Sequence, residues 1–444
     1  MEILQKDLAI IGAGPGGYEL AIKASNEGLD VCLFEYNKLG GTCLNYGCIP
    51  TKVYYQYAKV RKEAKNLYNQ ELPFNFQDLK NKKDEIVNNL VNGIASSLKN
   101  VTIINEKAKL SKINNEIVIS SENYIVNAKS IVIATGSKEK ILPIEGIEFA
   151  KTSNDILDLE VLPKKMAIIG GGVIGMEIAS IFNAFGVDVS VYEYFPQILP
   201  RIDKEVSRRL QNLLKLQGVK INTNSNVTSI KKENDNYTLN ANINNKEFSD
   251  EFDYILSSTG RIPNINDIGL DEVGINYTKN GIIVNEFNET NIKNVYTIGD
   301  AIGGIMLAHK ASNDGIIVLD HILNKVSLVN LDLIPSCSFT FPEIATIGLS
   351  EDECKEKAIE YKVLKELYRA NGKAHAIQET DGFVKIIVNN DEIIGASIIG
   401  AEASILIHEI STLMNAHIKV SNAKYYIHAH PTLSEIILSC LNKN

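Results

Sequence analysis

The 444-residue chain has no excess of positive charge and few cysteines. Lys and Arg total 45 against 54 Asp and Glu, a formal net charge of −9, so attraction to nucleic acid or to anionic lipid is not expected. Six cysteines are too few for the disulfide scaffold of a small secreted domain. The remaining composition, 45% hydrophobic and 22% charged, is typical of an ordinary globular protein.

Long apolar runs and targeting segments are also missing. The best candidate for a membrane span, residues 173–192, is interrupted by Glu177, Asn183 and Asp188, so a span is not expected. Met1–Leu8 carries three charged residues and offers neither an apolar signal core nor a transit segment rich in Arg and Ser. We therefore expect a cytoplasmic protein.

An internal repeat is the clearest positive feature. An apolar run enters a G-x-G-x-x-G motif in residues 7–17, and the same pattern returns 158 residues later in residues 165–175. Each motif is followed by a predicted helix, over 18–27 and 176–185, and then by a strand that ends in a carboxylate. The matching positions are Gly12, Gly14, Gly17 and Glu35 in the first copy, and Gly170, Gly172, Gly175 and Glu193 in the second. Two βαβ units predict two parallel, helix-covered sheets.

The two units have the parts of a dinucleotide site. A lone G-x-G-x-x-G is equally compatible with a simple tight turn. Binding of a pyrophosphate also needs a helix N-terminus directed at the anion and an acidic residue for the ribose hydroxyls. All three parts occur twice, so two dinucleotides are expected, and the natural pair is a flavin and a nicotinamide.

A later strand, residues 295–300, indicates which unit takes which cofactor. It ends in Gly299-Asp300, which suits the second part of an extended cofactor, so FAD is assigned to the N-terminal unit and NAD to the second. Glu193 favours NAD because a carboxylate repels a 2′-phosphate, and no Arg lies between Gly186 and Pro200. The alternative is that Glu193 is simply solvated.

The rest of the chain predicts further elements. Apolar spacing indicates helices over 56–68 and 79–98, and similar strand ends at 131–136 and 253–260 extend the duplication. From about residue 334, strands at 384–388 and 393–399 and a helix at 405–416 indicate a separate α+β domain. We expect an α/β protein with two Rossmann-like domains and a C-terminal α+β dimerisation domain. The division is 1–147 and 268–333 for FAD, 148–267 for NAD, and 334–444 for the interface domain.

Cys43 and Cys48 stand in a block that runs from Gly40 to Lys52. Their spacing does not match zinc ligands, no second cluster completes a set, and no metal site is expected. On an ideal helix, positions i and i+5 lie about 8–9 Å apart, beyond the limit of about 7 Å for a disulfide. A redox pair therefore requires a distorted helix or a turn, which Gly47 and Pro50 permit. Two unrelated buried cysteines are the alternative.

This block resembles the redox-disulfide signature of the flavoprotein disulfide reductases, the FAD-dependent pyridine nucleotide-disulfide oxidoreductase family. The terminal block, His428 to Glu435, resembles that of the dihydrolipoamide dehydrogenases within the family. The resemblance covers nearly the whole chain, including both dinucleotide units, Thr135-Gly136, Gly260-Arg261, Gly299-Asp300 and Leu307-Ala308-His309.

The resemblance implies a role for each of these groups. Cys43 exchanges with the substrate, and Cys48 faces the flavin. His430, supplied by the second subunit of a homodimer, is the general base, and Glu435 orients it. Lys52 and Glu177 match a pair beside the flavin; an unpaired surface charge is the alternative for each. The full cofactor set is Gly12, Gly14, Gly17, Glu35, Lys52, Thr135, Gly136, Gly170, Gly172, Gly175, Glu177, Glu193, Gly260, Arg261, Asp300, Leu307, Ala308 and His309.

The function implied is oxidation of protein-bound dihydrolipoamide to lipoamide with NAD as the acceptor. The partners implied are a second copy of the chain and the lipoyl domains and core acyltransferase of a 2-oxo acid dehydrogenase complex, or the lipoyl protein of glycine cleavage. Two alternatives remain: a reductase of a glutathione-like disulfide that uses NAD(P)H, and a subunit whose chief role is docking. Tyr46, Thr51 and Ile405 depart from the usual family residues, which leaves thiol access and the polarity of the interface in question.

Overall fold

A computed structural model describes residues 1–234 and 236–444. The chain divides into two compact units. The first unit comprises Met1–Thr51, Lys80–Lys140 and Gly260–Leu331, and the second comprises Lys52–Leu79, Ile141–Thr259 and Asp332–Asn444.

The first unit is built on a seven-stranded sheet in the order β3-β2-β1-β6-β5-β4, with β18 also paired to β6. Strands β1, β2, β3, β6 and β18 pair in parallel, whereas β4 and β5 extend the sheet antiparallel. The expectation of a wholly parallel sheet is therefore incomplete here. The strands are β1 (Glu2–Ile11), β2 (Val31–Phe34), β3 (Thr102–Ile104), β4 (Lys109–Ile113), β5 (Glu116–Ser120), β6 (Tyr124–Ile133) and β18 (Val295–Thr297).

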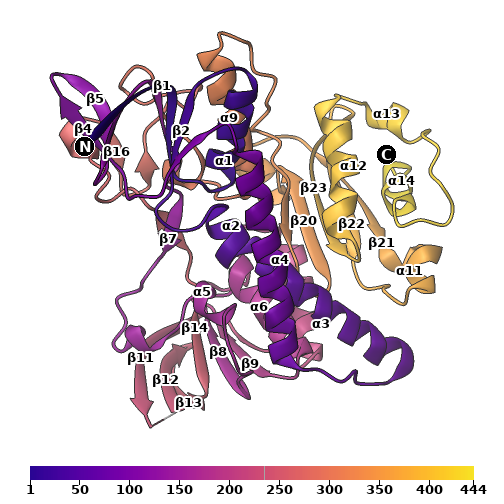
Figure 1. The fold of residues 1–444 in the computed structure, drawn as a ribbon. Helices are drawn as coiled ribbons and strands as arrows, with labels where there is room; N and C mark the ends of the chain where they lie inside the picture. Colours follow the sequence, from indigo (N-terminus) through magenta and orange to yellow (C-terminus); the bar gives the residue numbers. More distant parts are fainter. Residues whose placement is uncertain (235) are drawn as a thin grey trace. The chain divides into compact units, whose positions relative to one another are not determined.

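Continuous apolar runs form the centre of this sheet because both of its faces are covered. Leu8, Ala9 and Ile10 of β1 are completely buried. Helices α1 (Pro15–Asn26) and α9 (Ala308–Ile322) pack against each other (Figure 1). Their close approach uses Gly16, where a Cβ would lie 2.9 Å from the carbonyl oxygen of Ala311.

The second unit contains the repeat of this arrangement. A four-stranded parallel sheet has the order β10-β9-β8-β14, and α6 (Val173–Ala184) follows its strand β8. A three-stranded antiparallel sheet, β11-β12-β13, lies between β10 and β14 in sequence. The strands are β8 (Lys165–Ile169), β9 (Asp188–Tyr192), β10 (Lys220–Asn222), β11 (Ser225–Glu233), β12 (Asn236–Ile243), β13 (Lys246–Phe252) and β14 (Tyr254–Ser257).

The C-terminal part of the second unit is a five-stranded antiparallel sheet in the order β19-β20-β23-β22-β21. Helix α12 (Ala403–Asn415) packs on β23 and β20, and α14 (Glu435–Leu441) packs on β21 and β22 (Figure 1). The strands are β19 (Ser336–Ser338), β20 (Glu343–Gly348), β21 (Lys362–Leu367), β22 (Phe383–Asn389) and β23 (Glu392–Gly400). The predicted α+β fold of this region is confirmed.

Three helices follow β2, and the first two carry the cysteine block: α2 (Gly41–Tyr46), α3 (Cys48–Tyr68) and α4 (Phe76–Ser97). The last two match the predicted helical pair. No helix among the described residues is long and apolar enough to cross a membrane. The other elements are β7 (Ser137–Glu139), η1 (Ile147–Phe149), α5 (Ser153–Ile156), α7 (Lys204–Leu216), β15 (Arg261–Pro263), α8 (Leu270–Val273), β16 (Tyr277–Thr278), β17 (Gly281–Ile282), η2 (Gly299–Ile302), α10 (Glu351–Glu356), η3 (Tyr368–Ala370), α11 (Gly372–Ala376) and α13 (Val420–Ala423).

The predicted fold class, two Rossmann-like folds and an α+β domain, is confirmed. The four-segment division of the chain stays a prediction.

The buried ammonium group of Lys385 forms ion pairs with carboxylates from two other segments of the second unit. Lys385 on β22 is only 3% exposed at its side chain, and its Nζ lies 3.0 Å from Asp203, 2.9 Å from Glu205 and 3.6 Å from Glu351. Asp203 also caps α7 by accepting hydrogen bonds from the backbone of Glu205 and Val206. Burial opposes the charge on Lys385, but the hydrogen bonds that its ammonium group donates to Glu205 and Asp203 outweigh this effect and raise the pKa of Lys385.

We expect Lys385→Met to destabilise the protein by about 3–5 kcal/mol, because it leaves the buried Asp203 carboxylate without its counter-ion. The matched control is Lys220→Met, which removes an exposed partner of Asp188 and should cost about 1 kcal/mol or less. Urea unfolding of both variants measures the difference. Equal midpoints for the two variants would contradict the argument.

Candidate redox and dinucleotide sites

The two glycine-rich loops have nearly the same geometry. Gly12 and Gly170 have φ of +105° and +103°, and a Cβ on either would lie 2.4 or 2.6 Å from a carbonyl oxygen of the neighbouring strand end, at Ala134 or Ser258. At the third glycine of each loop, Gly17 or Gly175, a Cβ would lie 1.9 or 2.1 Å from the carbonyl oxygen of the first. These positions accept only glycine, because they let the helix start directly against the strand.

The middle glycine of each loop is different. A Cβ on Gly14 or on Gly172 would meet nothing within 4 Å. Each of these residues is the N-cap of a twelve-residue helix and has no side chain that caps the helix. The first N–H groups of α1 and α6 therefore remain available to an anion, which the helix dipole favours. Open space beside unpaired N–H groups fits a pyrophosphate in both units.

The two acidic residues at the strand ends are held alike. Glu35 Oε2 accepts a hydrogen bond from Ala13 N at 2.9 Å, and its Oε1 accepts one from Asn37 N at 2.8 Å. Glu193 repeats this pattern with Gly171 N at 2.5 Å and Phe195 N at 2.8 Å. Both carboxylates are buried and fixed beside their loops, and their remaining lone pairs suit ribose hydroxyls.

Asp300 belongs to a polar chain in the first unit. Its Oδ2 accepts a hydrogen bond from Ser137 Oγ at 2.5 Å, and Ser137 Oγ accepts one from Arg261 Nε at 2.8 Å. Arg261 also forms an ion pair with Glu139 at 2.8 Å. Sequence reasoning missed Ser137, although it directly follows the predicted Gly136.

Other predicted flavin residues lie in this unit. Thr135 Oγ1 is buried and has no hydrogen-bond partner among the described residues, as expected of a group that awaits a ligand. A Cβ on Gly136 or on Gly260 would meet nothing within 4 Å. Leu307 is the N-cap of α9, which begins with Ala308 and His309.

The turn that carries Asp300 is fixed from α9 by a residue that the sequence did not suggest. Asp314 is completely buried, and its Oδ2 accepts hydrogen bonds from Gly299 N at 2.9 Å and from Lys310 Nζ at 2.6 Å. Burial raises the pKa of Asp314 despite both bonds. No motif marks this position, because its role appears only once α9 packs on the turn.

Lys52 and Glu177 form the expected pair within the second unit. Lys52 Nζ lies 2.8 Å from Glu177 Oε2, and it also lies 4.2 Å from the centroid of the Phe339 ring. Glu177 Oε1 accepts a hydrogen bond from Phe339 N at 2.9 Å. The carboxylate therefore fixes the direction of the lysine side chain.

The helix that carries the two cysteines is interrupted, as a redox pair requires. Helix α2 ends at Tyr46, Gly47 adopts φ −142° and ψ −104°, and α3 starts at Cys48. Cys43 and Cys48 form a close pair. Thr51 donates its hydroxyl to the carbonyl oxygen of Gly47 at 2.6 Å, which holds the break at the start of α3.

The other thiols are poorly suited to exchange. Burial raises the pKa of Cys32 and of Cys440 to about 12, and that of Cys337 to about 11. Burial also raises the pKa of Cys354. A thiol that stays protonated is a poor nucleophile, so none of these four resembles a redox-active cysteine.

His430 and Glu435 form a pair in the second unit. His430 Nδ1 lies 3.0 Å from Glu435 Oε1, and the imidazole is 78% exposed. Glu435 Oε2 accepts a hydrogen bond from Thr432 N at 2.8 Å. That bond, followed by the one with His430, lowers the pKa of Glu435.

A second histidine–carboxylate pair lies close in sequence. His428 Nε2 is 2.7 Å from Glu409 Oε1, and Glu409 also accepts a hydrogen bond from Ser434. Burial opposes protonation of His428, but the bonds to Glu409 and to the Tyr426 carbonyl outweigh it and raise the pKa of His428. This imidazole is only 12% exposed, which suits a structural role.

Comparison with known proteins places these sites in a family. Residues 6–315 match the pyridine nucleotide-disulphide oxidoreductase domain, and residues 334–439 match the dimerisation domain of the same family. The chain belongs to the pyridine nucleotide-disulphide oxidoreductases.

Particular relatives share almost its whole length. Dihydrolipoyl dehydrogenase from Chlamydia pneumoniae is 36% identical over 97% of this chain and 95% of the relative, and that from Bacillus subtilis is 35% identical over 98% and 97%. Leghemoglobin reductase from Glycine max is 36% identical over 98% of this chain and 86% of the relative. Among solved structures, the HOCl-induced flavoprotein disulfide reductase RclA from Escherichia coli has a TM-score of 0.89 at 26% identity, and 99% of each chain is covered.

The family confirms the predicted oxidoreductase class and the predicted cofactors, FAD and NAD. The dimerisation domain supports the homodimer. A dinucleotide fits the open glycine loop of each unit on the geometry described above, and the assignment of FAD to the first unit and NAD to the second stays a prediction.

The middle glycines give a paired test of cofactor placement. We expect Gly14→Ala to fold but to bind FAD at least about tenfold more weakly, the equivalent of about 1.4 kcal/mol, because the new methyl occupies the space facing the pyrophosphate. Gly172→Ala should keep its FAD and raise the KM for NADH instead. Flavin content after dialysis and NADH-dependent reduction of ferricyanide measure the two effects. Loss of FAD from both variants would contradict the assignment.

Proposed function

We propose that the protein oxidises dihydrolipoamide, carried on a partner protein, to lipoamide with NAD as the acceptor, the activity of a dihydrolipoyl dehydrogenase. The observation that carries the proposal is the interruption at Gly47, which allows Cys43 and Cys48 to form a close pair beside the first dinucleotide unit. Full-length similarity to proteins named dihydrolipoyl dehydrogenase supports it.

In the proposed reaction, Cys43 and Cys48 begin as a disulfide. A thiolate of the substrate attacks Cys43 Sγ, a mixed disulfide forms, and Cys48 leaves as the thiolate. The second substrate thiol then attacks the mixed disulfide, which releases Cys43 and gives the cyclic disulfide of lipoamide. Two electrons now reside on the two cysteines, and the bound FAD and NAD supply the hydride chemistry that removes them.

His430 accepts the proton of the incoming thiol in this scheme and acts on the Cys43 of the other subunit in the homodimer. Its high exposure within one chain is consistent with a base that serves a neighbouring chain. Glu435 orients the ring through Nδ1 and stabilises the imidazolium that forms. Lys52, fixed by Glu177, places a positive charge that we assign to the flavin site.

We propose lipoyl domains and the core acyltransferase of a 2-oxo acid dehydrogenase complex, or the lipoyl protein of glycine cleavage, as partners. The lipoyl domains of the complex and the lipoyl protein of glycine cleavage present the same dithiol on a flexible arm, so one active site can oxidise the dithiol of either partner. The cytoplasmic location expected from the sequence stays a prediction.

The proposed function is tested by comparing two substrate pairs on the purified flavoprotein. NAD with dihydrolipoamide should support fast turnover, whereas NADPH with oxidised glutathione should not, because the fixed Glu193 carboxylate repels a 2′-phosphate. Cys48→Ser should abolish dithiol oxidation but retain reduction of ferricyanide by NADH. Faster turnover with the glutathione pair would reject the proposal in favour of the other reductase.

The His430–Glu435 pair predicts a graded loss of activity. We expect His430→Ala to lower kcat for dihydrolipoamide by about 10²–10⁴-fold, and Glu435→Gln to lower it by a smaller factor. Because hydrogen bonds lower the pKa of Glu435, its carboxylate is ionised throughout neutral pH, and the pair is lost only as the pH falls below the ordinary carboxyl range.

The matched control is Glu409→Gln, which removes the carboxylate beside His428 instead. It should leave kcat nearly unchanged between pH 6 and 8. An effect as large as that of Glu435→Gln would show that the second pair, and not only the first, supports the reaction.

A further inference from the structure

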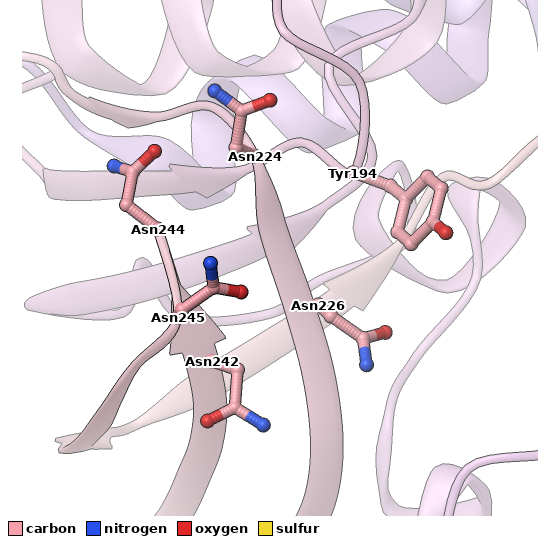
Figure 2. Close-up of a pocket in the computed structure, with 6 residues that line it drawn as sticks. All are labelled: Tyr194, Asn224, Asn226, Asn242, Asn244 and Asn245. Atoms are coloured by element: carbon pink, nitrogen blue, oxygen red, sulfur yellow. The ribbon is translucent and has the colours of Figure 1, made fainter.

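Most asparagines of the second unit face solvent, and one does not. Figure 2 shows five exposed ones around a polar hollow of about 650 Å³: Asn224, Asn226, Asn242, Asn244 and Asn245. Asn371 is only 8% exposed, and it is the one buried asparagine in the described part of this unit. A buried amide needs hydrogen-bond partners, so the partners of Asn371 show what it holds in place.

Asn371 joins helix α11 to the segment that carries His430. Its side-chain oxygen caps α11 by accepting a hydrogen bond from Ala374 N at 2.9 Å. Its Nδ2 donates to the carbonyl oxygen of Thr432, 61 residues further along the chain, at 3.0 Å. Ala374 and the neighbouring Leu433 belong to the same hydrophobic core, so α11 also packs with this segment. Both ends of the amide are therefore bonded to backbone groups.

Thr432 in turn controls the carboxylate beside His430. Its backbone N–H donates to Glu435 Oε2 at 2.8 Å, and its hydroxyl donates to the carbonyl oxygen of Ala429 at 2.8 Å. The other oxygen of Glu435 lies 3.0 Å from His430 Nδ1. The bond from Thr432 N is the largest of the effects that lower the pKa of Glu435. The position of Thr432 therefore determines where this carboxylate lies.

A different contact reaches the same segment from α12. Glu409 accepts a hydrogen bond from Ser434, which is the N-cap of α14. This contact does not involve Thr432 or the carboxylate of Glu435. The amide of Asn371, by contrast, binds the residue that binds the carboxylate.

We propose that Asn371 is a positioning residue for the base of the reaction. Its amide fixes Thr432, and Thr432 fixes the carboxylate of Glu435. That carboxylate directs the ring of His430, so Asn371 acts through its neighbours and not on the substrate. A base that is displaced slows the proton transfer more than it weakens substrate binding. This inference rests on the proposed function, because His430 serves as the base in that reaction.

Asn371→Asp separates this role from the capping of α11. Asp has the same shape and is as good an N-cap as Asn, but its carboxylate cannot donate to the carbonyl oxygen of Thr432. We expect kcat for dihydrolipoamide to fall by about 10–100-fold, with little change in its KM and none in the reduction of ferricyanide by NADH. Asn371→Ser keeps a capping oxygen without adding charge, and it should give the same result.

The matched control is Asn389→Asp. Asn389 lies at the end of β22, and its Nδ2 donates to the carbonyl oxygen of Glu360 at 2.6 Å, so the same kind of bond is removed elsewhere. This variant should keep the wild-type kcat. Wild-type kcat in both Asn371 variants, or an equal loss in the control, would overturn the proposal.

A double variant distinguishes positioning from a general structural effect. Because Asn371 acts through His430, Asn371→Asp should have no further effect on kcat once His430→Ala is present. The same fold-loss in the His430→Ala background as in the wild type would also overturn the proposal.

Crystal structures of the wild type and of Asn371→Asp give a readout that needs no substrate. We expect the bond between Thr432 N and Glu435 to be lost in the variant. An unchanged segment would reject the inference whatever the substrate. A displaced segment in a protein whose wild type fails to oxidise dihydrolipoamide would reject only the proposed function.

Discussion

Two sulfur atoms five residues apart can form a bond only if the helix between them is broken, and the chemistry of this protein depends on that break. Gly47 leaves helical geometry between α2 and α3, and its carbonyl oxygen accepts hydrogen bonds from both the backbone N–H and the hydroxyl of Thr51. A continuous helix would hold the two Cα atoms about 8–9 Å apart, beyond the limit of about 7 Å for a disulfide. The rest of the first unit supports this short segment beside a dinucleotide loop.

The two glycine-rich loops have the same backbone geometry, although they are predicted to bind two different cofactors. In each loop, the first and third glycines allow contact between backbones, and the middle glycine faces open space. In each, a carboxylate binds the loop and the chain after its own strand. Since the loops are nearly equivalent, the choice between FAD and NAD must come from what surrounds them. In the first unit this includes Asp300 and its partners.

Much of the fold and of the site could be predicted from the sequence, because glycine spacing, apolar runs and the cysteine block each report a local constraint. The need for a distorted helix near Gly47 followed from helix geometry alone, and the break is present. Ser137 and Asp314 could not be found in this way, since each acts through a partner more than ten residues distant in sequence. The antiparallel pairing of β4 and β5 was not predicted, because short alternating runs do not reveal the direction in which strands pair.

The four buried or half-buried thiols outside the redox pair affect which cysteines a disulfide or thiol substrate can react with. Because burial keeps them protonated, a passing disulfide meets a single reactive centre on each chain. Non-productive disulfides between the substrate and these four cysteines, which would inactivate the enzyme, are therefore suppressed, even though each catalytic cycle breaks and forms disulfide bonds.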